Sequence, residues 1–310
     1  MTSYLTSQWP SRWYRLVRAR GGGAFGVVYE CEVVVGDGVV GPAKFAAKIL
    51  RNSNDAENVE RFAQEARLGG QLRHPNLIRV VDVNLSHNPP YFVMELMTET
   101  LRNRLQRWAT ANAVYRAKAA LEGVLLPLCR AVAHLHLKRI YHRDIKPENI
   151  YFGRGDNAVL GDLGICKEQN FFRPQLTWCG LGTPRYTAPE TLQYGIASPQ
   201  SDIYSLGVVL YEMLTGRTPA GWWWNNAGNL PSLQHPTSCH RFVDQLLVNM
   251  THPDASRRYS HVVHVMRDMV QLIRTFLPPL PAYRPSSQVL AAQHPLAVRR
   301  LRRLPAPRIR

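Results

Sequence analysis

The N-terminal part of the chain has the hydrophobic pattern of β-strands. Residues 27–35 are rich in β-branched side chains that partly alternate with polar ones, and residues 45–50 and 91–94 form further short apolar runs. Residues 36–38, Gly-Asp-Gly, are typical of a hairpin turn. Because short β-branched runs separated by turns favour a pleated sheet, we expect a small antiparallel sheet here.

A helical spacing of apolar residues appears in two parts of the chain. One helix is predicted over residues 54–72, where Val59, Phe62 and Ala66 recur at helical spacing. Beyond residue 98 the apolar stretches become longer and richer in Ala and Leu. We expect helices there at residues 113–138, 201–214, 241–250 and 262–276.

These elements divide the chain into four segments. Residues 1–12 are expected to form a disordered lead. A small antiparallel β-sheet with one main helix is expected over 13–97, and a larger, mainly helical lobe over 98–276, which together make a two-lobed α+β fold. Proline density rises after Leu277, so residues 277–310 are predicted to be a stiff tail outside the packed domain.

Composition places the chain among soluble globular proteins. It has 310 residues, of which 45% are hydrophobic and 19% charged, enough for two lobes. The N-terminus lacks the pattern of a signal peptide, and the longest apolar stretches fall short of the roughly 18 residues that span a bilayer. The five cysteines include no C-x-x-C pair, which argues against a disulfide framework or a zinc site and favours a cytoplasmic location.

Part of the positive charge of the chain lies near its C-terminus. The formal net charge is +16, and the stretch from Phe276 to Arg310 contains seven arginines and no acidic residue. Such a tail attracts acidic proteins, nucleic acid or an anionic membrane surface. A solvated tail that only improves solubility is the alternative.

A glycine-rich segment lies between two predicted strands. Residues 21–28 follow the pattern G-x-G-x-x-G-x-V, in which glycines let the backbone approach a polyphosphate closely. No helix opens directly after it, which argues against a dinucleotide-binding loop. Lys48 follows inside the apolar run of residues 45–49, where its ammonium needs a partner such as a phosphate. An edge-strand lysine that faces water is the alternative.

Three further motifs follow in a fixed order. Residues 141–150, Tyr-His-Arg-Asp-Ile-Lys-Pro-Glu-Asn-Ile, match the pattern H-R-D-x-x-x-x-N. Asp162-Leu163-Gly164 begins 18 residues after Asp144, and residues 182–190 contain Gly-Thr-Pro and Ala-Pro-Glu. With this order and spacing, the chain from about residue 13 to residue 276 resembles the eukaryotic-type (Hanks-type) serine/threonine protein kinase catalytic domain.

The resemblance implies an ATP site between the two lobes. The glycines would cover the phosphates, and Lys48 would contact the α- and β-phosphates. Val28 and Ala46 would line the faces of the adenine, and the backbone of Glu95 and Met97 would hydrogen-bond to it. The residues that the resemblance assigns to nucleotide binding are Gly21, Gly22, Gly23, Ala24, Phe25, Gly26, Val28, Ala46, Lys48, Glu95 and Met97.

The resemblance also assigns the catalytic and metal-binding roles. The helix glutamate that holds the strand lysine precedes a His-Pro-Asn by nine residues, which selects Glu65 over Glu60. Asp144 would accept the proton of the substrate hydroxyl. The remaining roles are a γ-phosphate contact that marks serine/threonine specificity (Lys146), a threonine packed beside it (Thr183), and the Mg²⁺ ligands Asn149 and Asp162.

Two landmarks are expected to support the larger lobe. The resemblance pairs Glu190 with Arg258 in a buried ion pair. It also makes Asp202 the aspartate that anchors the backbone of the catalytic loop.

The chain departs from the family pattern at two positions. Leu163 stands where phenylalanine is usual, and it should still fill an apolar slot. Gly69 stands four residues after Glu65, where the family has a bulky apolar residue that stacks on residue 163. We expect a gap there, which Leu68 could fill, and a loosely held helix whose active position depends on ATP, a partner or phosphorylation.

Two further features have a functional and a structural interpretation. Thr177 is the only hydroxyl residue between Gly164 and Gly182, so it is the predicted autophosphorylation site, whose phosphate would meet Arg143. A segment that needs no phosphate is the alternative. The three adjacent tryptophans at 222–224 could form a docking surface or fill the core.

Two alternatives to an active protein kinase remain, and one further activity is compatible with it. A pseudokinase that binds ATP as a scaffold usually lacks one of the lysine and aspartate residues that stand here. A small-molecule kinase of related fold is disfavoured by Thr183 and by the Ala-Pro-Glu motif. Nucleic-acid binding through the tail would be an additional activity.

Overall fold

The structure is a computed structural model that describes most of the two predicted lobes. The described residues are 4–9, 11–22, 26–36, 38–108, 117–153, 155–163, 167–168, 184–218 and 239–276. Those up to Phe276 belong to one compact unit.

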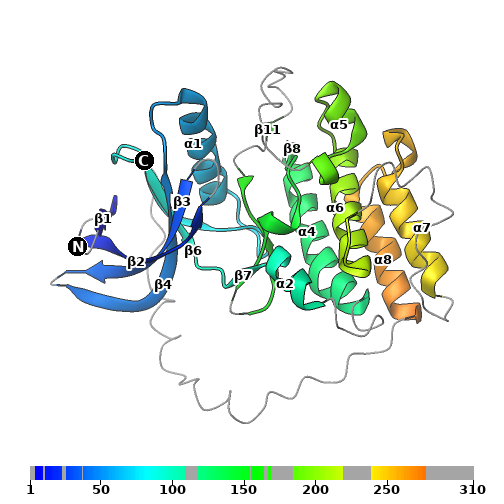
Figure 1. Ribbon diagram of the computed structural model, residues 1–310, viewed down its shortest axis with the longest axis horizontal. Helices are drawn as coiled ribbons and strands as arrows, with labels where there is room; N and C mark the ends of the chain where they lie inside the picture. Colours follow the sequence, from blue (N-terminus) through cyan, green and yellow to red (C-terminus); the bar gives the residue numbers. More distant parts are fainter. Residues whose placement is uncertain are drawn as a thin grey trace, which may run out of the picture. The chain divides into compact units, whose positions relative to one another are not determined.

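The smaller lobe is a six-stranded antiparallel sheet with one helix, as predicted (Figure 1). The strand order is β1-β2-β3-β4-β6-β5. The helix α1 runs from Ala56 to Gln71, and the Asp55 side chain caps it by accepting hydrogen bonds from the backbone of Glu57 and Asn58. The strand bounds are β1 Tyr4–Thr6, β2 Arg12–Gly22, β3 Gly26–Val35, β4 Val39–Leu50, β5 Val80–Asn84 and β6 Tyr91–Glu95.

The two faces of this sheet belong to different apolar clusters, because successive strand residues point to opposite sides. On one face, Leu50 and Phe92 pack against Phe62 and Ala66 of α1. On the other face, a second apolar cluster contains Leu5, Tyr14, Cys31, Ala47, Tyr91 and Val93. We call these the inner and the outer face.

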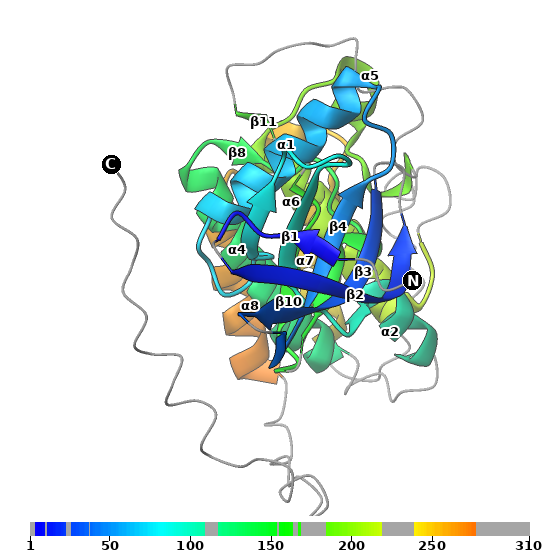
Figure 2. The ribbon, with the colours of Figure 1, turned by 90° about the vertical axis from the view of Figure 1, so that its left-hand side faces the viewer.

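The N-terminal residues are more ordered than the sequence analysis expects. Instead of a disordered lead over residues 1–12, β1 pairs with the start of β2, and Leu5 is buried on the outer face (Figure 2). Asp82 on β5 accepts hydrogen bonds from Ser7 and from the Tyr14 hydroxyl, the latter at 2.8 Å. These buried polar contacts fasten the segment to the sheet, and the residue pattern gave no sign of them.

The larger lobe is mainly helical, with short strands near the first lobe (Figure 1). Its helices are α2 Leu101–Trp108, α4 Leu126–Leu137, α5 Pro189–Tyr194, α6 Pro199–Thr215, α7 Cys239–Thr251 and α8 Val262–Phe276; a π-helical segment, Ala119–Leu125, precedes α4. Its strands are β7 Glu99–Thr100, β8 Ile140–Tyr141, β9 Ile150–Phe152, β10 Ala158–Leu160 and β11 Lys167–Glu168. The described residues of this lobe also contain the 3₁₀ segments Pro147–Asn149, Pro184–Tyr186 and Ala255–Arg257. The α+β expectation is therefore confirmed.

Helix α6 forms the centre of this lobe. Every residue from Ser201 to Leu214 is buried, which is the pattern of a helix surrounded by other elements. Ser198 and Ser201 form a reciprocal capping box at its start, and Gly216 ends it with a φ of 72°. The buried helix gives the catalytic loop a fixed support through Asp202.

One segment has the length and apolarity of a membrane-spanning helix, contrary to the sequence expectation. It is Ala119–Leu137, with a mean hydropathy of 1.3. Half of the segment is buried, and side chains such as Leu121, Leu128 and Leu135 belong to the core of the lobe. A core helix of a folded domain passes the same test, so the observation is weak evidence for a membrane span.

Candidate active site

Lys48 lies on the inner face of the sheet and meets two carboxylates. It is paired with Val28 on β3 and with Phe92 on β6. Its Nζ atom is 2.6 Å from Oε2 of Glu65 on α1 and 3.8 Å from Oδ1 of Asp162. The predicted partner Glu65 is therefore confirmed, while Glu60 is exposed. This contact fixes α1 against the strand that carries Lys48.

The three charged groups shift one another's protonation. Burial raises the pKa of Glu65 to about 7; Lys48 opposes this rise and the Asp162 carboxylate adds to it. Burial lowers the pKa of Lys48, but the carboxylates of Glu65 and Asp162 outweigh it and the net direction is upward. When both carboxyl groups are ionised, the single ammonium beside them leaves a net negative charge that attracts a cation.

The catalytic loop brings Asp144, Lys146 and Asn149 together. Lys146 Nζ lies 2.6 Å from Oδ2 of Asp144, and Asn149 Nδ2 donates to the same oxygen at 2.9 Å. Asn149 Nδ2 also donates to the Asp144 backbone oxygen at 2.8 Å, which closes the loop. The net pKa of Asp144 is raised, because the effect of burial exceeds the opposing effect of the Lys146 ammonium. Asp144 is thus held in one orientation with one oxygen doubly hydrogen-bonded.

Asp202 fixes the backbone of this loop, as predicted. Its two carboxylate oxygens accept hydrogen bonds from the backbone N–H groups of His142 and Arg143, each at 2.9 Å. His136 Nε2 lies 2.9 Å from Oδ2 of the same carboxylate. Arg143 has a φ of 69°, a conformation that costs energy for a residue with a side chain. The buried aspartate supplies hydrogen bonds that offset this cost.

The loop is also tied to the strand that precedes Asp162. His142 Nε2 lies 3.0 Å from the carbonyl oxygen of Gly161, and the Gly161 N–H donates to the Asn149 carbonyl at 2.9 Å. Asp162 itself has a φ of 61°. Asp144 and Asp162 are therefore held relative to each other by short backbone contacts.

Leu163 fills an apolar slot, but the gap expected at Gly69 does not exist. Leu163 is fully buried in the same apolar cluster as Leu68, as expected for both residues. At Gly69, an added Cβ atom would come within 2.5 Å of Val80 Cγ2. Val80 already occupies the space, so the interpretation of a loosely held helix loses its structural basis.

The described part of the predicted nucleotide site lies on the inner face. Val28, Ala46 and Lys48 share this face because Val28 is paired with Lys48 and Ala46 is two residues away. A Cβ atom at Gly26 would come within 2.7 Å of the Ile49 carbonyl oxygen, so glycine is needed there. Gly21 and Gly22 end β2 opposite Val28 and Val27, whereas Gly23, Ala24 and Phe25 lie outside the described residues.

The predicted adenine contacts lie at the end of the sheet. Glu95 is the last residue of β6, and Met97 follows before β7. The N–H of Glu95 already donates to the Arg79 carbonyl at 3.2 Å, so any adenine contact of Glu95 would use its carbonyl oxygen. The position of these residues fits the prediction without testing it.

Asn149 and Asp162 have the donor atoms that a divalent metal needs. The Asn149 amide nitrogen donates to Asp144, which leaves the amide oxygen as the group able to bind a cation. The Asp162 carboxylate is one-third exposed. Among the described residues no group of three His, Cys, Asp or Glu side chains could hold a metal. Two oxygen ligands therefore fit a cation that takes its other ligands from phosphates and water.

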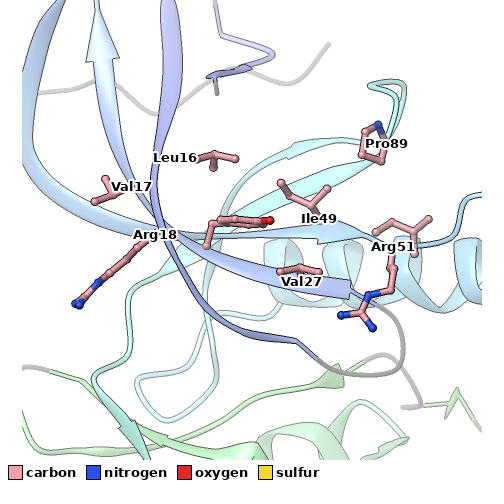
Figure 3. A pocket seen from close by; sticks show the side chains of 9 residues that line it. Leu16, Val17, Arg18, Val27, Ile49, Arg51 and Pro89 are labelled. Carbon is pink, nitrogen blue, oxygen red and sulfur yellow. The ribbon is translucent and has the colours of Figure 1, made fainter. Parts of the chain in front are cut away.

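A separate cavity of about 420 Å³ lies on the outer face and does not belong to this site. Leu16, Val27 and Ile49 line it, with Pro89 and Arg51 at its edge (Figure 3). Val27 and Ile49 are paired with each other and adjoin Val28 and Lys48 along the strands, so they point to the opposite side of the sheet.

The predicted ion pair of the larger lobe is confirmed. Arg258 Nη1 and Nη2 each lie 2.8 Å from one carboxylate oxygen of Glu190, a bidentate geometry. The guanidinium is fully buried and also donates to the backbone carbonyls of His252, Gln200 and Pro253. It fixes α5, which begins within the Ala-Pro-Glu motif.

Some predicted residues lie outside the described part of the chain. These are Thr183, Thr177, the tryptophans at 222–224 and the basic tail at 277–310. Their roles stay predictions.

Two side chains near the site were not predicted from the sequence. His136 contacts Asp202 across 66 residues of sequence, and nothing in the pattern distinguishes it from His134 in the same helix. Tyr151 packs against Gly161, where a Cβ atom would come within 2.9 Å of its ring. Burial and the nearby Asp162 carboxylate raise the pKa of Tyr151. None of the sequence motifs includes Tyr151 or Gly161, so their contact could not be predicted from the motifs.

Comparison with known proteins agrees with this geometry. The family model described as "Protein kinase domain" matches residues 14–296. The chain is 37% identical over 208 residues to the serine/threonine-protein kinase PrkC of Bacillus subtilis, and 31% identical over 290 residues to Pkn1 of Myxococcus xanthus. It is 28% identical over 269 residues to the probable serine/threonine-protein kinase PknB of Lactococcus lactis.

Each match covers a larger share of this chain than of the relative. They include 66%, 91% and 83% of this chain, but only 31%, 38% and 41% of the relatives. The chain therefore spans less than half the length of each of these relatives.

Proposed function

The chain belongs to the protein kinase family, and from this premise we propose that it is an active serine/threonine kinase. It would transfer the γ-phosphoryl group of ATP to serine and threonine hydroxyls of proteins. The observation that carries the proposal is that the charged and amide residues of the family pattern that the structure describes lie in contact. Lys48 meets Glu65 and Asp162, and Asp144 meets Lys146 and Asn149.

The reaction needs little covalent work from the protein. The substrate hydroxyl oxygen bonds to the γ-phosphorus, the bond from that phosphorus to the β,γ-bridging oxygen breaks, and ADP leaves with the electron pair. Asp144 accepts the hydroxyl proton. The protein's remaining contribution is to hold the reactants in position and to stabilise charge, because these two effects supply most of the rate in phosphoryl transfer.

Two lysines would stabilise the phosphates at different points. Lys48, fixed by Glu65, would contact the α- and β-phosphates. Lys146, 2.6 Å from Asp144, would stabilise negative charge on the transferred group and place the hydroxyl beside its base. Its place two residues after the catalytic aspartate supports serine and threonine as acceptors, by resemblance to the family.

The cofactor we propose is ATP with Mg²⁺. Protein kinases use ATP with a divalent metal, and Mg²⁺ prefers the oxygen ligands that Asn149 and Asp162 offer. When bound, the metal supplies charge neutralisation between the phosphates. The Asp162 carboxylate, which lies 3.8 Å from Lys48 Nζ and is one-third exposed, supports a cation there.

The experiment that tests the function is an assay with radiolabelled ATP and a mixed protein substrate, followed by mapping of phosphorylated residues. Wild-type protein should label serine and threonine. Asp144→Asn should retain nucleotide binding and lose about 10²-fold or more in rate, because the general base is gone.

A scaffold that binds ATP without transferring phosphate would give equal, background labelling for both proteins. The same mapping tests Thr177, which we propose as the autophosphorylation site; an unlabelled Thr177 in a labelled protein would contradict that assignment alone. A cytoplasmic location and contacts of the basic tail with acidic partners are proposals that rest on composition.

A further inference from the structure

The loop between α1 and β5, which contains the His-Pro-Asn motif, is bound to a strand of the larger lobe. The Asn76 side chain donates to the Ala158 carbonyl oxygen at 2.9 Å, and the Asn76 carbonyl oxygen accepts a hydrogen bond from the Leu160 N–H at 2.9 Å. The loop follows the helix that carries Glu65 and is bound to β10, the strand that leads to Asp162. It therefore connects the two elements that position these carboxylates.

His74 closes this loop only as a neutral ring. Its Nδ1 atom accepts the backbone N–H of Asn76 at 3.1 Å, and its carbonyl oxygen accepts the Leu77 N–H at 3.1 Å. A backbone N–H can only donate, so Nδ1 must carry a lone pair and the proton of the neutral ring lies on Nε2. Protonation of Nδ1 would place two donors against each other. The closed loop therefore requires His74 to be neutral.

A second histidine packs against the first. The ring centroid of His134, on α4 of the larger lobe, lies 5.3 Å from that of His74, with an angle of 33° between the ring planes. The Nε2 atom of His134 is buried and has no hydrogen-bond partner within the described part of the chain. A protonated imidazole carries N–H on both nitrogens, so the cation would leave a buried donor without an acceptor. The packing therefore favours neutral His134 as well.

The charged groups around the pair all carry positive charge. On α4, Arg130 acts on His74 and Lys138 acts on His134. Asp202 of α6 contacts a different histidine of α4, and no carboxylate among the described residues acts on either ring, those of the neighbouring helix α8 included. Burial first, and these cations in addition, lower the pKa of both histidines.

We propose that the contact between His74 and His134 is a pH-sensitive latch, which holds the loop closed while both rings are neutral and releases it when they are protonated. The closed loop takes up protons less readily than the open one. Closure is therefore favoured above the usual histidine pKa of about 6.5 and weakens as the pH falls below it.

Release of the latch has a consequence for the active site. It loosens the attachment of α1 to β10, and with it the placement of Glu65 and Asp162, so acid should slow phosphoryl transfer. This consequence rests on the proposed function, whereas the opening of the loop does not.

Ring packing without a response to pH is the competing explanation. It predicts that the loop stays equally protected from solvent at neutral and mildly acid pH. The latch predicts that protection is lost in acid, and that the loss disappears when the two rings can no longer be protonated.

The test is hydrogen exchange of the full chain, followed by mass spectrometry of residues 73–80 between about pH 7.5 and about pH 5.5 and corrected for the intrinsic pH dependence of exchange. We expect wild-type protection to fall about tenfold or more, because keeping one histidine neutral one pH unit below its usual pKa costs a factor of about ten. In the double variant His74→Asn/His134→Phe, protection should stay within about twofold. Asparagine accepts the N–H two residues further on, and phenylalanine keeps an aromatic ring at the contact.

A second histidine pair, at the start of α8, provides the matched control. The rings of His261 and His264 lie 5.9 Å apart, and His261 is exposed. His261→Asn/His264→Phe makes the same two substitutions and should show the wild-type fall in protection. Each single variant of the latch, His74→Asn or His134→Phe, should show a smaller fall than the wild type, which keeps the test decisive if the double variant folds poorly.

The catalytic consequence is measured as kcat/KM of the wild type divided by that of the double variant, a ratio that cancels the titration of Asp144. The ratio should be near one at about pH 7.5 and fall about threefold or more at about pH 5.5. Wild-type protection that does not change with pH, or an equal fall in the double variant, overturns the latch. A loop that opens while the ratio stays constant overturns its effect on catalysis. A protein whose loop responds to pH but which transfers no phosphate overturns the proposed function and leaves the latch supported.

Discussion

Val80 on β5 occupies the space that a side chain at Gly69 on α1 would need. A Cβ atom at Gly69 would lie 2.5 Å from Val80 Cγ2 and 3.3 Å from Val80 Cβ. The first distance is far below ordinary van der Waals contact, and Val80 is held by the strand backbone. The glycine therefore lets α1 approach the sheet closely, and this close approach places Glu65 beside Lys48.

We predict that Gly69→Ala destabilises the protein by about 1–3 kcal/mol despite the better helix propensity of alanine, because the helix must move from β5. Kinase activity should fall as well, since Glu65 moves with the helix. Urea denaturation followed by fluorescence measures the first effect and a peptide assay the second. A variant with unchanged stability and higher activity would revive the idea of an unfilled gap.

The neighbouring glycine provides the matched control. No atom lies within 4 Å of a Cβ atom built at Gly70 in the same helix. Gly70→Ala should therefore stabilise the protein by up to about 1 kcal/mol through helix propensity alone. Adding Val80→Ala to Gly69→Ala should relieve the steric part of the penalty.

Loss of the buried ion pair between Arg258 and Glu190 should strongly destabilise the folded protein. Arg258→Met leaves a largely buried carboxylate and three backbone carbonyls without their donor. We expect a loss of about 3–5 kcal/mol in the free energy of unfolding, measured by urea denaturation. Arg267, an exposed arginine bound to Asp268 on α8, is the control, and Arg267→Ala should change stability by no more than about 0.5 kcal/mol. Equal effects of the two substitutions would contradict the structural role of the pair.

Asp202 should make the stability of the protein depend on pH in the acid range. Burial raises its pKa, but the hydrogen bond and charge of His136 and the backbone N–H of Arg143 outweigh burial, so the net pKa is lowered. A carboxyl group with a lowered pKa in the folded state stabilises the fold above its unfolded pKa of about 4, and this contribution disappears as the pH falls through the folded value.

The measurement compares wild-type protein with Asp202→Asn by denaturation between about pH 7 and about pH 3. The stability difference should be largest near neutral pH and shrink below about pH 4. A difference for Asp202→Asn that stays constant with pH would contradict the assignment.

Lys146 should set the acid limit of the reaction through Asp144. Burial raises the Asp144 pKa, and the ammonium 2.6 Å away lowers it. Lys146→Met removes the lowering effect, so the acid limb of the pH profile of kcat/KM should move to higher pH. Lys146→Arg keeps the positive charge and should leave the limb near its wild-type position. A limb that does not move in the methionine variant would show that Asp144 does not control it.

The sequence by itself determined the fold class and the local chemistry of the loop. Asp144, Lys146 and Asn149 lie within six residues, so a tight loop brings them together whatever surrounds it. The distant pairs of Lys48 with Glu65 and of Glu190 with Arg258 were found only through the family resemblance, since no local rule joins residues so far apart. Helix positions followed from apolar spacing. The boundaries differ by a few residues from the predicted ones, because N-cap residues such as Asp55 and Ser198 set where the helices begin.

Only the tertiary structure decided the contacts that depend on how whole elements pack. The pattern around Gly69 indicated a gap, and the approach of β5 fills it with Val80. The lead was expected to be disordered, and Asp82, 75 residues beyond Ser7, accepts a hydrogen bond from Ser7 and fastens the lead to the sheet. Arg102 on α2 donates hydrogen bonds to Glu148 and Glu212, which lie 46 and 110 residues further along the chain. The spacing of these residues does not predict the contacts. Local conformation depends on neighbours in the chain, whereas packing and charge pairing depend on the closed fold.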